Sequence, residues 1–200
     1  MTRGVFVTAT DTGVGKTYLS SAIATELRRQ GLKVGVAKPV VTGLDDPGPH
    51  DHELLDAVTA YTFGPPVSPH LAAELAGTEL DPSVLIGAAH AAAVGNDVVV
   101  VEGVGGLLVP LTRDYTVRDF ATALGYPVIV AARPVLGTLN HTRLTLEAAR
   151  DLDVRAVVLT PWPADPSVME EDNRTMLGAH VLPQDGDVSE LPVLDWLGPS

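Results

Sequence analysis

The stretch ATDTGVGKT at residues 9–17 contains glycines, a lysine and a hydroxyl residue in the order that phosphate binding requires. In such loops, backbone N–H groups surround phosphate oxygens, the lysine neutralises charge, and the following hydroxyl contacts Mg²⁺. Lys16 and Thr17 occupy those two positions. Ala9 stands where the strict pattern has glycine, but a methyl group fits wherever φ stays negative. We therefore predict that the loop still binds a nucleoside triphosphate.

Two further charged residues end apolar runs. Glu102 closes the run DVVVVE and is followed by Gly103, Gly105 and Gly106, which let a backbone approach a ligand closely. Since Mg²⁺ prefers oxygen ligands, Glu102 is a candidate second ligand. Lys38 ends the run at residues 34–38 and could bridge a substrate and a phosphate. The alternative interpretation of Glu102 is a solvated residue at a strand end, and that of Lys38 is one more surface charge.

The elements that must position these residues alternate between strands and helices. Apolar, β-rich runs at residues 5–8, 34–38, 97–102, 127–132 and 155–160 predict strands buried on both faces, as in a parallel sheet. Helical patterns cover residues 16–29, 52–60, 82–95, 117–124 and 139–152. We expect a three-layer, doubly wound α/β fold with ligands at the carboxyl ends of the strands. Residues 43–50 predict a mobile, turn-rich loop, and residues 161–200 are weakly patterned.

Composition bounds the class of protein. With 200 residues, 46% of them hydrophobic, the chain predicts one domain spanning residues 1–200. A net charge of −12 without a basic cluster argues against nucleic acid as a partner. No apolar run approaches the roughly 18 residues of a membrane span, so we expect a cytoplasmic protein with no membrane partner. The absence of cysteine excludes disulfides, thiolate metal sites and a cysteine nucleophile.

Five blocks of sequence together resemble the dethiobiotin synthetase family of the P-loop NTPase superfamily. They are TDTGVGKT, KPVVTG, YTFGPPVSPH, VEGVGGLLVPL and LGTLNHTRLTLEA, and the resemblance runs from about residue 6 to residue 159. It implies an ATP- and Mg²⁺-dependent ligase of biotin biosynthesis. Such an enzyme carboxylates 7,8-diaminononanoate with CO₂ and closes its ring to dethiobiotin, through a carbamate and a carbamic-phosphoric anhydride. The resemblance also implies a homodimer.

The same resemblance implies roles for particular residues. Lys38 matches the catalytic lysine, with Lys16 assisting it, and Thr17, Asp51 and Glu102 match metal ligands. Asp45 and Asp46 compete with Asp51 for the third acidic position, because the preceding loop makes the alignment ambiguous there. The implied nucleotide contacts are Thr12, Gly13, Val14, Gly15, Lys16, Thr17, Tyr18, Asp51, Glu102, Gly103 and Gly105, with Thr160 and Pro161 beside the base.

The implied substrate site has two parts. One surrounds the reacting diamine and consists of Thr12, Lys38, Thr42, Gly105, Gly106, Leu107 and Val109. The other is a helix N-terminus at Gly137, Thr138, Leu139 and Asn140, which would bind the distant carboxylate of a substrate held by the partner subunit. Free N–H groups and the helix dipole suit an anion there. Asn140 has an alternative role as a helix cap.

The nucleobase site departs from the family pattern. Many relatives have Asn-Asp after the late strand, whereas this chain continues VVLTPWP and offers no side-chain amide to read an adenine. We therefore predict weak discrimination among nucleoside triphosphates. Trp162 is expected as a core or interface anchor more than as a stacking surface for the base. The sequence His50-Asp51-His52 also permits a transition-metal site, although i, i+2 histidines without a third histidine nearby are usually solvated.

Two other functions use a similar loop. Cobyrinate-type amide ligases carry a glutaminase domain with a cysteine nucleophile, which a chain without cysteine cannot provide. Partitioning ATPases of the MinD kind typically have an early lysine in the loop, where this chain has Thr10-Asp11-Thr12. Nucleotide hydrolysis that depends on a diamine and bicarbonate would favour the synthetase, and hydrolysis stimulated by DNA or lipid would favour the rival.

Overall fold

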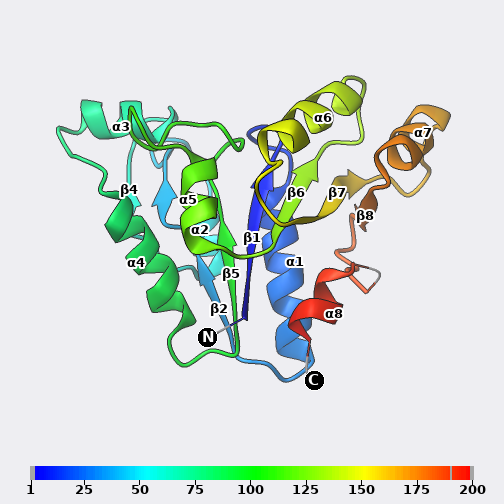
Figure 1. Ribbon diagram of the computed structural model, residues 1–200, viewed down its shortest axis with the longest axis horizontal. Helices are drawn as coiled ribbons and strands as arrows, with labels where there is room; N and C mark the ends of the chain where they lie inside the picture. The colour runs from blue at the N-terminus through cyan, green and yellow to red at the C-terminus, as the bar shows by residue number, and fades with distance from the viewer. Residues whose placement is uncertain (1–2, 190, 199–200) are drawn as a thin grey trace.

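The computed structural model, which describes residues 3–189 and 191–198, contains a parallel sheet in the strand order β2-β5-β1-β6-β7-β8. Its strands are β1 (Arg3–Ala9), β2 (Val34–Ala37), β5 (Val98–Glu102), β6 (Val128–Ala132), β7 (Val154–Trp162) and β8 (His180–Pro183). All five neighbouring pairs are parallel. The predicted doubly wound α/β fold is therefore confirmed. β1 is central and runs toward the top of the view in Figure 1.

Helices cover both faces of this sheet. The longer ones are α1 (Lys16–Arg29), α4 (Pro82–Ala93), α5 (Val117–Leu124), α6 (Thr138–Ala148) and α7 (Val168–Leu177). Three short helices are α2 (Asp51–Leu55), α3 (Pro69–Leu75) and α8 (Val193–Leu197), and a small second sheet pairs β3 (Val40–Val41) with β4 (Tyr61–Thr62). In Figure 1, α3 lies at the upper left and α6 and α7 at the upper right.

Alternate residues of each strand pack into two separate cores. Phe6 and Val101 belong to the core that contains residues of α4 and α5, whereas Val7 and Val100 belong to the core that contains residues of α1 and α8. This alternation follows from the two-residue period of a strand, and both faces are apolar because both are covered. It explains why the strands read as continuous apolar runs in the sequence.

Strand register brings the two predicted charged residues together. Val7 is paired with Glu102, and Ala37 is paired with Val101. Glu102 is two residues beyond Val100, and residue 38 is two residues beyond Val36, so both side chains project toward the α1 side of the sheet. The ends of β2 and β5 therefore place a lysine and a glutamate side by side beneath the start of α1.

Several element boundaries differ from those expected. The helix predicted over residues 52–60 is wrong beyond Leu55, because Asp56 adopts a left-handed conformation (φ 48°) and the chain then extends. Val58 forms a parallel bridge with Ala37, and its carbonyl accepts the N–H of Lys38 at 3.0 Å. Residues 43–50 are irregular, as expected, but three backbone hydrogen bonds tie residues 43–45 to residues 63–65.

The segment after residue 161 is more ordered than its sequence pattern suggests. It contains α7, β8 and α8, none of which was predicted. α7 begins with a capping box, in which the Ser167 hydroxyl accepts the N–H of Glu170 and the Glu170 carboxylate accepts the N–H of Ser167. Glu170 and Glu171 lie on the first turn of this helix, where Glu170 is half-buried and Glu171 is exposed. Within residues 3–189 and 191–198, no helix is long and apolar enough to cross a membrane.

Candidate active site

The phosphate loop connects β1 to α1 with the backbone geometry that its glycines permit. Gly13 and Gly15 have φ values of 68° and 99°, which other residues rarely adopt. Gly15 is the N-cap residue of α1, and no side chain of the described residues caps the helix there. The first N–H groups of α1 are consequently left for a ligand. This is the arrangement that an anion needs at a helix N-terminus.

Four side chains form a connected polar cluster beside the loop. The ammonium of Lys38 donates to Glu102 Oε1 at 2.5 Å and to Asp51 Oδ2 at 2.8 Å. The hydroxyl of Thr17 donates to the same Glu102 oxygen at 2.9 Å. Lys38 and Glu102 are 2% and 1% exposed. The cluster therefore joins the ends of β2 and β5 to the starts of α1 and α2, with Lys38 and Glu102 buried and the Asp51 side chain partly exposed.

The charges in this cluster stabilise one another. Burial alone lowers the pKa of Lys38, but the carboxylates of Glu102 and Asp51 outweigh burial and hold that pKa above its ordinary value. Burial raises the pKa of Asp51, yet the Lys38 ammonium and the Thr17 hydroxyl bring it below its ordinary value. Lys38 is thus a cation and Asp51 an anion at neutral pH.

Lys16 lies close to this cluster, but the nearby carboxylates do not outweigh the effect of burial on its pKa. It is buried, and its ammonium donates to the carbonyl of Asp11 at 3.3 Å. Burial, followed by repulsion from Lys38, lowers its pKa to about 8. An incoming phosphate would supply the negative charge that this lysine lacks.

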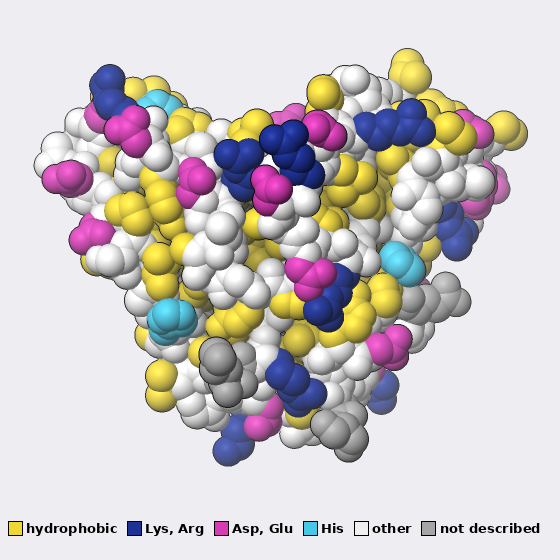
Figure 2. All heavy atoms as spheres, viewed as in Figure 1, with side chains coloured by type: hydrophobic (Ala, Val, Ile, Leu, Met, Phe, Trp, Pro, Cys, Tyr) yellow, Lys and Arg dark blue, Asp and Glu magenta, His cyan; other side chains and the backbone are white. Residues whose placement is uncertain are grey.

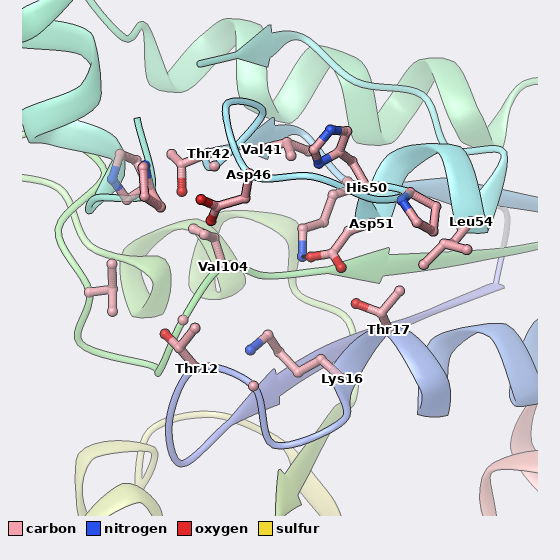
Figure 3. Close-up of a pocket in the computed structure, with 18 of the residues that line it drawn as sticks. Thr12, Lys16, Thr17, Val41, Thr42, Asp46, His50, Asp51, Leu54 and Val104 are labelled. Carbon is pink, nitrogen blue, oxygen red and sulfur yellow. Dashed lines mark hydrogen bonds and ion pairs between the residues drawn. The ribbon is translucent and has the colours of Figure 1, made fainter. Parts of the chain in front are cut away.

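A cavity of about 940 Å³ opens over the loop and the cluster. In Figure 3, Lys16 points into it from the phosphate loop, Asp46 and Thr42 border it on the opposite side, and Asp51 and Thr17 lie beside each other. The predicted site residues that line it are Thr12, Gly13, Gly15, Lys16, Thr17, Tyr18, Lys38, Thr42, Asp51, Gly105 and Val109. One cavity therefore contains both the predicted phosphate cradle and the predicted substrate pocket.

Some predicted residues lie outside this cavity. Leu107 is 2% exposed and does not line it, so the structure corrects the expectation that Leu107 forms part of the diamine site. Val14 packs in the core, and Gly106 lies against the end of β1. Gly103 also lies outside the cavity, buried between Phe6 and Val117.

The residues expected near the nucleobase are placed behind the loop. Thr160 is fully buried, and a Cβ on Gly15 would come within 3.1 Å of its side chain. Pro161 is exposed and does not line the cavity. Trp162 belongs to the core, as expected, and is only 7% exposed. Tyr18 reaches the C-terminal segment, where its hydroxyl donates to the carbonyl of Pro183 at 2.8 Å.

The expected carboxylate anchor lies on the other side of the molecule's upper rim, at the start of α6. Gly137 is the N-cap (φ 96°), so the alternative role of Asn140 as the helix cap is wrong. Thr138 is buried and its hydroxyl lies 3.4 Å from that of Thr142, whereas Asn140 is exposed. Gly137, Thr138, Leu139 and Asn140 do not line the cavity of their own chain.

The three competing aspartates occupy different places. Asp51 contacts Lys38, Asp46 lines the cavity, and Asp45 lies against Gly64 away from it. Among the described residues, no group of three or more His, Cys, Asp or Glu side chains is arranged as a metal site. Of the three aspartates, Asp51 is the one that joins Lys38, Glu102 and Thr17 in the polar cluster. The His50-Asp51-His52 sequence does not form such a group among the described residues.

Sequence reasoning missed two contributions to this site. Ser68 lines the cavity beside Pro66 and Val67, and its hydroxyl lies 3.0 Å from His70 Nδ1. Arg133 donates to two carbonyls of the phosphate loop. Arg133 directly follows the apolar run at residues 127–132, so the rule that drew attention to Lys38 and Glu102 could have found it as well.

The parallel sheet, the loop and its lysine define a P-loop nucleotide-binding protein. A family model described as an AAA domain matches residues 3–197. ATP-dependent dethiobiotin synthetase BioD of Anaeromyxobacter dehalogenans (strain 2CP-1) is 47% identical over 180 residues, covering 83% of this chain and 81% of that protein. The protein of that name in Mycobacterium sp. (strain JLS) is 44% identical over 185 residues, covering 86% and 81%. The chain belongs to the dethiobiotin synthetase family.

Solved structures support the fold at lower identity. A ParA family ATPase from Chlorobium tepidum is 15% identical with a TM-score of 0.56, covering 98% of this chain and 90% of its own. Cobyrinic acid a,c-diamide synthase from Mycobacterium smegmatis is 16% identical with a TM-score of 0.53, covering 92% and 85%. These likenesses show a shared fold, whereas the site and the closer relatives distinguish this chain from both proteins.

Proposed function

We infer that this chain is an ATP-dependent dethiobiotin synthetase that carboxylates 7,8-diaminononanoate and closes its ring to the cyclic urea. The observation that carries this inference is the single cavity that joins the phosphate loop to Lys38 and Thr42. A ligase that transfers a phosphoryl group to its own substrate needs both ligands in one enclosure. Family membership at 44–47% identity supports the same activity.

The reaction accumulates negative charge, and the cations of this site lie where that charge would form. One amine of the substrate takes up CO₂ and releases a proton to give a carbamate, whose oxygen attacks the γ-phosphate and releases ADP. The second amine then attacks the carbamate carbon and expels phosphate. Lys16 and Lys38 both line the cavity, and they are the groups that hold the two anions together. The buried position of Lys38 keeps its charge unscreened by solvent.

The acidic side of the cluster fits Mg²⁺. Glu102 Oε2 is buried and has no hydrogen-bond partner among the described residues. Asp51 and the Thr17 hydroxyl add two further oxygen ligands. The ion pairs of both carboxylates with the Lys38 ammonium support the proposal that this donor set can accept a cation. We propose that Glu102, Asp51 and Thr17 hold the ion, which would neutralise phosphate charge when bound. The proposal places the enzyme in the cytoplasm, where ATP is supplied.

Thr42 and Val109 are proposed to orient the diamine. Both line the cavity, and Thr42 offers a small hydroxyl that can accept from or donate to an amine. Gly105 borders the same space with a φ of 58°, and a Cβ there would come within 2.8 Å of Val109. A side chain on Gly105 would therefore displace the apolar wall of the substrate pocket.

We also propose that two copies of the chain form a homodimer through α6 and α7. Exposed apolar side chains lie on or just before these two helices: Val135, Leu136, Leu144, Val168, Met169 and Met176. Hydrophobic side chains are visible at the upper right of Figure 2, where Figure 1 shows α6 and α7. Leu136 is 86% exposed and adjoins the N-terminus of α6. A second copy packed here would bury these residues and present the start of α6 to the substrate of its partner.

The dimer proposal has its own test. Leu136→Asp should give a monomer in sedimentation velocity and raise the KM for the diamine more than the KM for ATP. Val94→Asp is the matched control, since Val94 is 78% exposed at the end of α4, far along the chain from α6. A dimer that survives Leu136→Asp would count against this interface.

The activity itself is tested by the dependence of nucleotide hydrolysis on substrates. Release of phosphate from ATP should require both the diamine and bicarbonate, and omitting either should reduce it to background. Hydrolysis that ignores the diamine but responds to DNA or lipid would contradict the synthetase and favour a partitioning ATPase. Because the assay follows phosphate, the same plate compares ATP with the other nucleoside triphosphates, for which we predict weak discrimination.

A further inference from the structure

Arg133 lies where the sheet meets the phosphate loop. It directly follows β6, and the N–H of Thr10 donates to the carbonyl of Ala131 at 3.0 Å, so β6 is paired with β1 up to the start of the loop. The next residue is Pro134, which confines the backbone of Arg133 to extended conformations. The amide of Asn173 on α7 lies 3.5 Å from the carbonyls of Pro134 and Val135. The backbone around Arg133 is therefore held by the pairing of β6 with β1 on one side and by Asn173 on the other.

The guanidinium crosses from β6 to the loop. Arg133 Nη2 donates to the carbonyl of Thr12 at 3.1 Å and to the carbonyl of Gly13 at 3.0 Å. These are two consecutive peptide groups of the turn that precedes Lys16. Hydrogen bonds from a charged donor are stronger than neutral ones, and one guanidinium nitrogen here serves both carbonyls.

Those two contacts determine where the loop's N–H groups point. A trans peptide is planar, so its C=O and N–H are directed oppositely. Drawing the carbonyls of Thr12 and Gly13 toward Arg133 turns the N–H groups of Gly13 and Val14 away from it. A loop that directs its N–H groups toward a phosphate must direct the carbonyls of the same peptides away from that phosphate. Gly13 can adopt the necessary positive φ of 68°, and a Cβ there would come within 3.1 Å of Arg133 Nη2.

We propose that Arg133 is a positioning residue that holds the phosphate loop in its nucleotide-binding conformation, through the carbonyls of Thr12 and Gly13. It acts on the loop and not on the reacting atoms. The inference rests on the proposed function only in taking Mg-ATP as the ligand. Its consequence is specific, because nucleotide affinity depends on Arg133 whereas binding of the diamine at Thr42 and Val109 does not.

The test uses three variants of the whole chain. Arg133→Met keeps an unbranched apolar stem but removes the donors, and Arg133→Lys keeps a cation that can reach fewer acceptors. Arg150→Met is the matched control, because Arg150 is an exposed arginine just beyond α6 that pairs only with Glu147 and Asp151 among the described residues. Calorimetry measures the Kd of a non-hydrolysable ATP analogue with Mg²⁺, and steady-state kinetics measure KM for ATP and for the diamine.

We expect Arg133→Met to raise the Kd for the analogue and the KM for ATP about tenfold, the equivalent of one to two net hydrogen bonds, with the KM for the diamine unchanged. Arg133→Lys should fall between this variant and the wild type, and Arg150→Met should match the wild type. An Arg133→Met variant that binds the analogue with wild-type Kd would overturn the inference alone. A wild-type protein that binds no Mg-ATP analogue would overturn the proposed function and the inference with it.

Discussion

Lys38 directly after β2 and Glu102 at the end of β5 project from the same face of two neighbouring parallel strands, and their side chains meet in a buried ion pair. The pair is shared with Asp51, so one ammonium balances two carboxylates. We therefore expect Lys38 to stabilise the fold as well as to serve the proposed catalysis. Experiments can separate these two roles.

Removing the ammonium should destabilise the fold by leaving the two carboxylates uncompensated. We expect Lys38→Met to lower the free energy of unfolding by about 3 kcal/mol, the cost of breaking a buried ion pair from one side. Lys38→Met combined with Glu102→Gln should recover at least half of that loss, because the buried carboxylate is then neutral. Urea unfolding followed by circular dichroism measures both.

Activity should behave differently in the same two variants. Both should lack synthetase activity, since neither has the cation that holds the carbamate and phosphate together. A double variant that regains turnover along with stability would show that Lys38 matters only for folding. An unfolding free energy that Lys38→Met leaves unchanged would contradict the buried pair.

Nucleotide affinity should weaken above neutral pH because of Lys16. Burial and Lys38 lower the pKa of Lys16 to about 8 in the ligand-free protein. The negative charge of a bound triphosphate should raise that pKa again. The affinity gained from this charge is full below the free pKa and is lost as the pH rises through it. Lys38 remains charged in this range, because its pKa is raised, so it does not mask the effect.

Between pH 7.5 and 9.5 we expect the Kd for a non-hydrolysable ATP analogue to rise about twenty-fold. Lys16→Met should bind weakly at both values and show little change between them. Fluorescence titration in a buffer of constant ionic strength is the measurement. A wild-type Kd that stays constant across this interval would contradict the assignment of Lys16 as the titrating phosphate ligand.

Two glycines in and beside α4 should respond in opposite directions to alanine. A Cβ on Gly35 in β2 would lie 1.8 Å from the carbonyl oxygen of Ala92 in α4, so Gly35→Ala must push the helix from the sheet at a cost of about 3 kcal/mol. Gly87, inside α4, is exposed and a Cβ there would meet nothing within 4 Å. Gly87→Ala should stabilise the protein by about 0.5–1 kcal/mol through helix propensity.

Thermal unfolding of the two variants checks this pair of expectations. Equal melting temperatures for Gly35→Ala and the wild type would mean that β2 and α4 are not as tightly packed as the structure shows. Both changes add one methyl group, but at Gly35 it meets the backbone of α4, whereas at Gly87 it faces open space on a helix.

The phosphate loop, Lys38 and Glu102 could be found in the sequence because each lies at the end of a continuous apolar run. The apolar runs predict a parallel sheet, and a parallel sheet brings the ends of its strands together at one edge. α7, β8 and α8 were missed for a physical reason. β8 is a short strand at the edge of the sheet, and α7 and α8 have mixed polarity and proline-rich connections.

Contacts between distant segments were the least predictable part. Leu107 is apolar and adjacent to a glycine-rich turn, but nothing in the sequence distinguishes a wall of the substrate pocket from the core in which it lies. Arg133 is a lone exposed arginine, and its role becomes visible only when β6 and the loop are seen side by side. Val58 was expected in a helix, but pairs instead with Ala37, which no local preference indicates.

The most direct measurement is product formation from labelled bicarbonate. Purified protein is incubated with 7,8-diaminononanoate, Mg²⁺, ATP and isotopically labelled bicarbonate, and the mixture is analysed by mass spectrometry. The account predicts dethiobiotin carrying the label in its ureido carbon, formed in equal amount to the phosphate released and absent with Lys38→Met. Release of phosphate without any labelled cyclic product would contradict it.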